Sequence, residues 1–206
     1  MKTQDFEAIG RTLLPNLPGF AVKGCLLFAR PVRHLLRGAC FDDSSFDTNL
    51  FFVHAFVQPL YVPFDTVALN LGWRLGGAAH RWDAKDPELI DKLRDGMRGA
   101  VMPFLLQVST PLDLVETARR LNWLGDVRVR ESVAYSLARA GNAGEAMEAL
   151  EDLVKGIDPT SEWQRQMADQ AEGLRNLLDK DPAGAQSQLD EWENQTIHHL
   201  RLEKYR

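Results

Sequence analysis

The hydrophobic periodicity of the chain changes near residue 80, and this change most strongly limits how the chain can fold. From about residue 20 to residue 75, apolar residues occur in short runs typical of β-strands, with a two-residue repeat that is clearest in the last run. From Asp86 onward they recur every three or four residues, which is the repeat of an amphipathic helix. A Gly- and Ala-rich segment over 76–83 separates the two patterns. The sequence therefore predicts an α+β protein, with a sheet domain over 1–83 and a helical region over 84–206.

The sheet is expected to contain four strands after a first helix over residues 4–14. The four strand-like runs cover residues 20–29, 33–41, 49–62 and 66–75. Short links join consecutive runs, which favours a four-stranded antiparallel meander. The third run is apolar on both faces, as is typical of a central strand, and its two prolines should bend its end out of the sheet. The fourth run alternates strictly, which predicts one packed face and one solvated face.

About six helices are expected in the remainder. Their predicted ranges are 87–107, 110–121, 126–140, 143–155, 161–179 and a last helix from 182 to near the C-terminus. Several begin with proline at the first helical position, where its missing N–H is not needed. Pro103 is expected to kink or end the first of them, because proline removes a helix hydrogen bond.

The third and fourth predicted helices, over residues 126–140 and 143–155, are joined by a short turn and form a pair. The pair contains Ala134, Gly141 at the turn, Ala146 in the second helix and Pro159 after it. In these features residues 131–159 resemble a tetratricopeptide-type (TPR-like) helix pair. A repeat array needs about three stacked units or more, so one unit predicts a helical hairpin and no solenoid. The resemblance implies a scaffold that presents its surface to other proteins.

Composition and charge limit the kinds of partner that the chain can bind. The net charge of −5 is uneven, with +1 over residues 1–83 and −6 over 84–206. An acidic half repels phosphate backbones, and sequence-independent nucleic-acid binding needs a basic surface, so no nucleic-acid partner is predicted. The chain has no apolar stretch of about 18 residues and no signal-peptide core near its first residue, so we expect a cytoplasmic protein that does not enter membranes.

The two cysteines, Cys25 and Cys40, are expected to be small buried residues of the sheet. If they face each other on neighbouring strands, a disulfide is geometrically possible, although a reducing compartment would disfavour it. The chain has no CxxC motif and no Cys/His cluster, so neither a zinc site nor any other metal or cofactor is predicted.

No GxGxxG, GxxxxGK[ST], HExxH or GxSxG motif occurs, which excludes the enzyme classes that these motifs mark but not enzymes in general. The densest polar group lies in a predicted loop over residues 42–47 and consists of Asp42, Asp43, Ser44, Ser45 and Asp47, with His54 following one strand later. Carboxylates and a histidine can hold a divalent cation or exchange protons with a substrate. The alternative is that the Asp side chains bond to the backbone of their own loop and that His54 belongs to the core.

A second group, Arg74, His80, Arg81 and Trp82, lies at the end of the sheet. Arginine and aromatic residues together are typical anchors of protein interfaces, so this group is the predicted binding surface. The alternative is that Trp82 caps the core where sheet meets helices and that the charged side chains are solvated.

These features predict a non-enzymatic protein-binding module, an adaptor or an immunity-like partner of bacterial type. Its acidic helical half would suit a basic protein partner. The rival hypothesis is a small enzyme or ligand binder with a pocket between sheet and helices, using Asp42, Asp43, Asp47, His54 or His80. A cluster of these residues in a concave pocket would favour the rival, and their dispersal would favour the binding module. A homodimer held by its helices is the third possibility.

Overall fold

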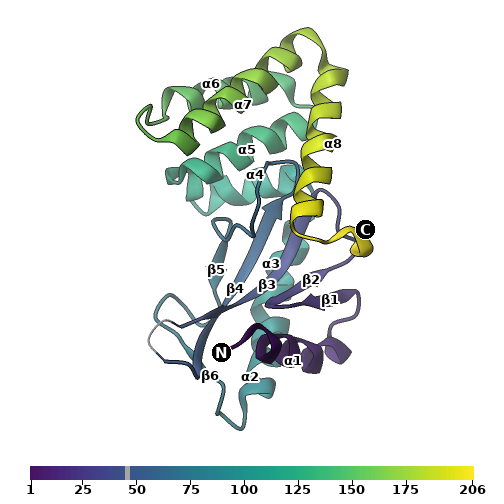
Figure 1. Cartoon of the computed structure of the whole chain (residues 1–206), viewed down its shortest axis with the longest axis vertical. Helices are drawn as coiled ribbons and strands as arrows, with labels where there is room; N and C mark the ends of the chain where they lie inside the picture. The colour runs from purple at the N-terminus through teal and green to yellow at the C-terminus, as the bar shows by residue number, and fades with distance from the viewer. Residues whose placement is uncertain (45–46) are drawn as a thin grey trace. The chain divides into compact units, whose positions relative to one another are not determined.

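The computed structural model describes residues 1–44 and 47–206, and it confirms the α+β class (Figure 1). A first helix and an antiparallel sheet precede a helical part. The strands are β1 (Phe20–Lys23), β2 (Leu26–Ala29), β3 (Leu35–Asp43), β4 (Leu50–Pro59), β5 (Gly72–Arg74) and β6 (Trp82–Asp83). The helices are α1 (Thr3–Leu13), α2 (Leu89–Gly96), α3 (Met102–Gln107), α4 (Pro111–Arg120), α5 (Val127–Arg139), α6 (Ala143–Lys155), α7 (Glu162–Lys180) and α8 (Pro182–His199).

The chain forms two compact units, which we name the sheet unit and the helical unit. The sheet unit holds residues 1–58, 71–107 and 204–206, and the helical unit holds residues 59–70 and 108–203. The chain therefore passes from one unit to the other four times. The domain boundary predicted between residues 83 and 84 stays a prediction, but α2 and α3 belong to the compact unit that contains the sheet.

The predicted meander is present, with the strand order β1-β2-β3-β4-β5 and with β6 also pairing with β4. The first predicted strand is corrected: residues 20–29 form two antiparallel strands, in which Lys23 pairs with Leu26. Gly24 makes the tight turn between them, at φ +56°, a left-handed conformation that glycine adopts without strain. The apolar residues on both sides of this turn gave it the appearance of one continuous strand.

The fourth predicted strand, residues 66–75, is also corrected, because only Gly72–Arg74 lies in the sheet as β5. Residues 59–70 leave the sheet and pack in the helical unit, where Leu60, Tyr61 and Val62 are fully buried. The bend predicted for the end of the third run is confirmed at this point, since β4 ends at Pro59, which has no N–H to donate to a strand ladder.

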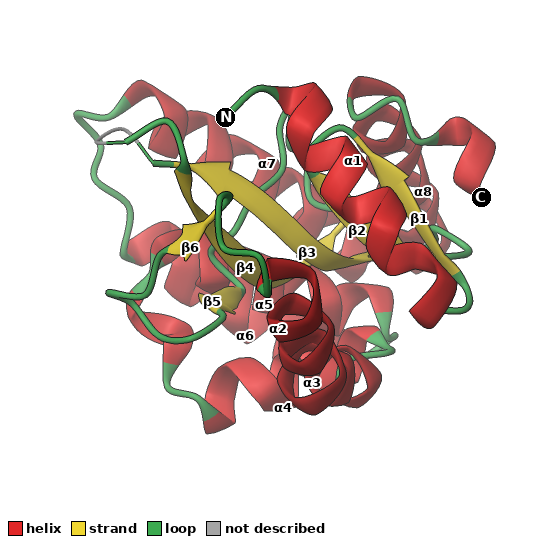
Figure 2. Cartoon of the chain, turned by 90° about the horizontal axis from the view of Figure 1, so that it is seen from below, coloured by secondary structure: helices red, strands yellow, loops and turns green. Residues whose placement is uncertain are grey.

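One face of the sheet is packed against helices of the sheet unit (Figure 2). Phe6 of α1 stacks on Phe41 of β3, with ring centroids 6.0 Å apart, and meets Phe51 of β4 at 5.7 Å. Trp73 of β5 contacts Phe104 of α3 edge to face at 6.0 Å. These aromatic contacts fix α1 and α3 against the strands and define this face as the core side.

The predicted kink near Pro103 is a π turn. The helical segment runs without a break from α2 through a π turn at Met97–Val101 into α3. The N–H of Met102 reaches the carbonyl of Met97, five residues back. A proline ring clashes with the carbonyl four residues earlier in a regular α-helix, and the wider π turn relieves that clash. This turn divides the first predicted helix into α2 and α3, which is why about seven helices follow the sheet instead of six.

The helical unit stacks α4, α5, α6 and α7 in succession, with α8 running across them (Figure 1). Two hydrogen bonds within this unit hold the segment 59–70. The hydroxyls of Tyr61 and Ser136 are 2.7 Å apart in a fully buried hydrogen bond, and Thr196 donates to the carbonyl of Val62 at 3.2 Å. None of the described helices is both long enough and apolar enough to cross a membrane.

Replacing Tyr61 tests whether the segment 59–70 is part of the helical core. Tyr61→Ala should lower the free energy of unfolding by about 3–5 kcal/mol, the usual loss for a large buried ring. Tyr61→Phe should lower it by only about 1 kcal/mol, because the ring stays and one hydrogen bond is lost. Urea unfolding followed by circular dichroism measures both. Equal, small losses for the two variants would show that the ring is not packed.

Candidate functional site

The face of the sheet opposite the core side carries the histidine and arginine that the sequence singled out. Residues paired directly across two strands place their side chains on the same face, and His54 pairs with Arg74. Phe52 lies two residues from His54 on β4 and shares this face, as does Asp42 on β3. The guanidinium carbon of Arg74 lies 4.0 Å from the centre of the Phe52 ring, and that of Arg81 lies 5.6 Å away. We name Asp42, Phe52, His54, Arg74 and Arg81 the basic–aromatic face.

The surroundings of His54 on this face disfavour its protonated form. Its Nε2 atom is 3.6 Å from Asp42 Oδ2, too far for a hydrogen bond, and is buried without a hydrogen-bond partner. Burial lowers the pKa of His54, the positive charge of Arg74 lowers it further, and the negative charge of Asp42 opposes both effects. An imidazole whose protonation is disfavoured does not form a strong charged pair with Asp42.

The predicted carboxylate cluster is dispersed. Asp43, next to Asp42 on β3, points to the opposite face and accepts a hydrogen bond from the amino group of Met1 at 2.7 Å. Asp47 accepts from the backbone N–H of Asn49 at 2.8 Å, a bond that lowers its pKa. Asp47 therefore bonds within its own loop, as the alternative interpretation expected. The neighbouring residues 45 and 46 of this predicted polar loop lie outside the described residues.

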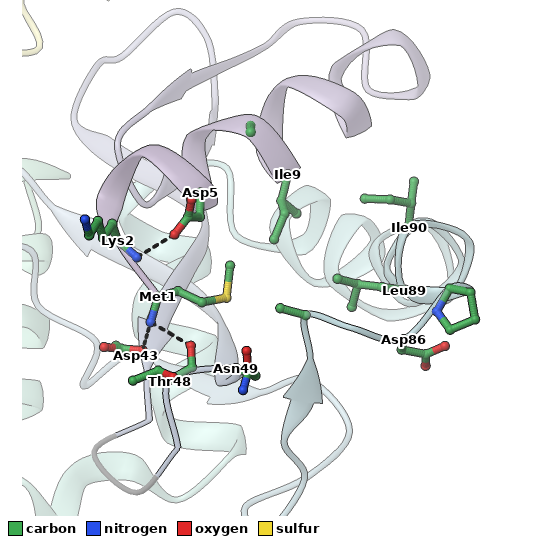
Figure 3. A pocket seen from close by; sticks show the side chains of 13 residues that line it. Met1, Lys2, Asp5, Ile9, Asp43, Thr48, Asn49, Asp86, Leu89 and Ile90 are labelled. Carbon is green, nitrogen blue, oxygen red and sulfur yellow. Dashed lines mark hydrogen bonds and ion pairs between the residues drawn. The ribbon is translucent and has the colours of Figure 1, made fainter.

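Asp43 lines an open pocket of about 900 Å³ in the sheet unit, between α1 and the start of α2 (Figure 3). Ile9, Leu89 and Ile90 supply apolar walls. The carboxylates in this pocket already have partners: Asp43 has the Met1 amino group, Asp5 accepts from the backbone N–H of Lys2 at 2.7 Å, and Asp86 pairs with Lys92 at 2.8 Å. The pocket has room for a small molecule, and its carboxylates are engaged in structural bonds.

The predicted binding group does not form one surface. Trp82 pairs with Phe51 across β6 and β4, so its side chain lies toward the core side, away from Arg74. His80 contacts the Trp82 ring edge to face at 4.7 Å. Arg74 and Arg81 instead meet around Phe52 on the other face. The position of Trp82 agrees with the alternative in which it caps the core. Whether any of these four residues binds a partner stays a prediction.

The helical unit has a surface that the sequence indicated only through its net charge. Helices α6, α7 and α8 with their links, residues 143–199, contain thirteen Asp and Glu and four Lys and Arg, and every one of those carboxylates except Glu193 is exposed. Between α6 and α7 lies a groove of about 390 Å³. We name it the acidic groove, and its lining residues are Gly144, Met147, Glu148, Glu151, Arg175, Asn176 and Asp179.

Phe52 and the acidic groove were both missed by sequence reasoning. The signal for Phe52 was its position two residues before His54, which places both on one face of β4. The signal for the groove was the spacing of Glu148 and Glu151, which share one side of α6. Among the described residues, no group of three or more His, Cys, Asp and Glu side chains could hold a metal ion.

The pKa of His54 reports the electrostatics of the basic–aromatic face. Arg74→Gln should raise this pKa, because it removes a positive charge that opposes protonation, and Asp42→Asn should lower it, because it removes a carboxylate that favours protonation. A titration of the imidazole Cε1 proton by NMR measures both shifts. Arg11→Gln, on the exposed side of α1, is the control and should leave the pKa unchanged. Shifts in the same direction for both variants would contradict this arrangement.

Comparison with known proteins does not assign the chain to a family. No protein-family model matches the chain, no curated protein is similar to it, and no solved structure matches its fold. The helical hairpin expected over residues 131–159 is present as α5 and α6, with Gly141 in the turn at φ +82°. Its membership of the tetratricopeptide type stays a prediction.

Proposed function

We propose that this chain is a non-enzymatic protein-binding module, an adaptor or immunity-like protein, that binds a basic protein at the acidic groove. The observation that carries the proposal is the concentration of exposed carboxylates on α6, α7 and α8, where thirteen acidic residues stand against four basic ones. A bacterial origin and a cytoplasmic location are part of the same proposal.

Charge and shape both support a protein as the ligand. Exposed charges of one sign steer an oppositely charged partner and raise the association rate. In the acidic groove Glu148 and Asp179 are exposed, and Met147 supplies a flexible apolar contact beside them. A lysine or arginine side chain can place its charged end between such carboxylates and its carbon chain on the methionine.

The dispersal of the rival's residues favours the binding module. Of Asp42, Asp43, Asp47, His54 and His80, Asp43 alone lines the 900 Å³ pocket. A catalytic site needs its acid, base or nucleophile within hydrogen-bond reach of one substrate position. A ligand-binding role for that pocket remains the second candidate, and the pocket's volume is the observation that favours it.

Charge reversal in the acidic groove tests the leading proposal. The intact chain should capture one stoichiometric basic protein from native lysate, and this capture should weaken as salt is added. Glu148→Lys with Asp179→Lys should lower the affinity at least tenfold, because two attractive contacts become repulsive. Capture followed by mass spectrometry identifies the partner, and titration calorimetry with the purified partner measures the affinity.

The matched control reverses the same number of exposed carboxylates in the sheet unit, by Asp91→Lys with Asp95→Lys on α2. This control should bind as the unchanged chain does. Equal weakening by both double variants would mean that net charge alone attracts the partner. A chain recovered as a monomer with a bound metabolite would overturn the proposal and support the pocket, and self-association as the only interaction would support the homodimer.

A further inference from the structure

The two cysteines of the chain meet at one end of the sheet. Cys25 lies in the turn between β1 and β2, and Cys40 lies on the neighbouring strand β3, opposite Leu26. Their sulfur atoms are 3.9 Å apart, and the backbone N–H of Phe41 donates to the carbonyl of Cys25 at 2.9 Å. Both are free thiols. The backbone bond holds the turn against β3 and keeps the two sulfur atoms next to each other.

The two thiols differ in exposure and in acidity. Cys25 is partly exposed, whereas Cys40 is buried. The Cys40 thiol donates a hydrogen bond to the Cys25 sulfur, which stabilises a thiolate there and lowers the pKa of Cys25 to about 7. The same bond and burial raise the pKa of Cys40. The negative charge of Asp42 disfavours both thiolates but is a smaller effect. An accessible thiolate beside a buried thiol is the arrangement of an attacking and a resolving cysteine.

We propose that Cys25 and Cys40 form a redox-active dithiol that exchanges with small-molecule disulfides. The Cys25 thiolate attacks one sulfur of a disulfide RSSR, whose S–S bond breaks, and one thiolate RS⁻ leaves and takes up a proton. The Cys40 thiol then loses its proton, and its sulfur attacks Cys25. The bond between Cys25 and RS breaks, the Cys25–Cys40 disulfide forms, and a second RSH is released. Counted from the form with two thiols, the chain gives up two electrons and two protons, one proton when the Cys25 thiolate forms and one from Cys40, and RSSR becomes two RSH.

This site is independent of the acidic groove, because it uses the sheet unit alone and needs no protein partner. Oxidation would link the turn between β1 and β2 covalently to β3. The modification therefore acts on the interior strand β3, two residues before Asp42, which is one of the residues of the basic–aromatic face.

Oxidised glutathione is the probe for the unchanged chain. After incubation with an excess at pH 7.5, acid quenching and N-ethylmaleimide labelling, the intact chain should be about 2 Da lighter and should bind no maleimide. Digestion should release one peptide pair joined through Cys25 and Cys40. A chain that keeps two maleimide-reactive thiols, or that carries one glutathione on each cysteine, would overturn the proposal.

Two single variants assign the roles. Cys40→Ser should stop the reaction at the first step and accumulate one glutathione on Cys25. Cys25→Ser should stay unmodified, because the remaining Cys40 thiol is buried and weakly acidic. In the unchanged chain, iodoacetamide at pH 7 should modify Cys25 roughly tenfold faster than Cys40. The reverse pattern, with the adduct on Cys40, would overturn the assigned roles even if a disulfide forms.

Discussion

The buried hydrogen bond between Tyr61 and Ser136 fixes the segment on which the rest of the architecture depends. Ser136 also donates to the carbonyl of Ser132 on the preceding turn of α5 at 2.6 Å, so the Tyr61 hydroxyl joins an existing bonded pair. A buried hydroxyl without a partner is costly, so this geometry favours one position of the ring. Because residues 59–70 connect β4 to β5, their burial in the helical unit determines where β4 ends and where β5 begins.

The helices were the part of the fold that the sequence could predict well. Helix ends depend on local chemistry: Thr110 caps α4 through a bond from the Asp113 N–H, and Asp126 accepts from the Arg128 N–H at the start of α5. Both signals are visible in a window of a few residues. The π turn before Pro103 was less predictable, because a proline can end, bend or widen a helix and the choice depends on what the helix packs against.

The strands and the site depended on contacts that local sequence does not contain. Alternation over residues 66–75 fits an extended chain, but it does not say whether that chain pairs with β4 or packs among helices. Asp42 and Asp43 are neighbours in sequence but lie on opposite faces of β3, so the two adjacent carboxylates have different surroundings in the fold. The proximity of Cys25 and Cys40 depends in the same way on the turn at Gly24, which lies in the middle of the strand predicted over residues 20–29.

The four passages of the chain between its units limit how the protein can be divided. A fragment that stops at Gln107 would lack Tyr205, whose ring meets Phe28 of β2 edge to face at 5.0 Å and whose carbonyl accepts from the N–H of Val32. A fragment that begins at Val108 would lack Tyr61. Neither half of the gene thus encodes a complete hydrophobic core, and an exchange of modules by recombination would have to move both compact units together.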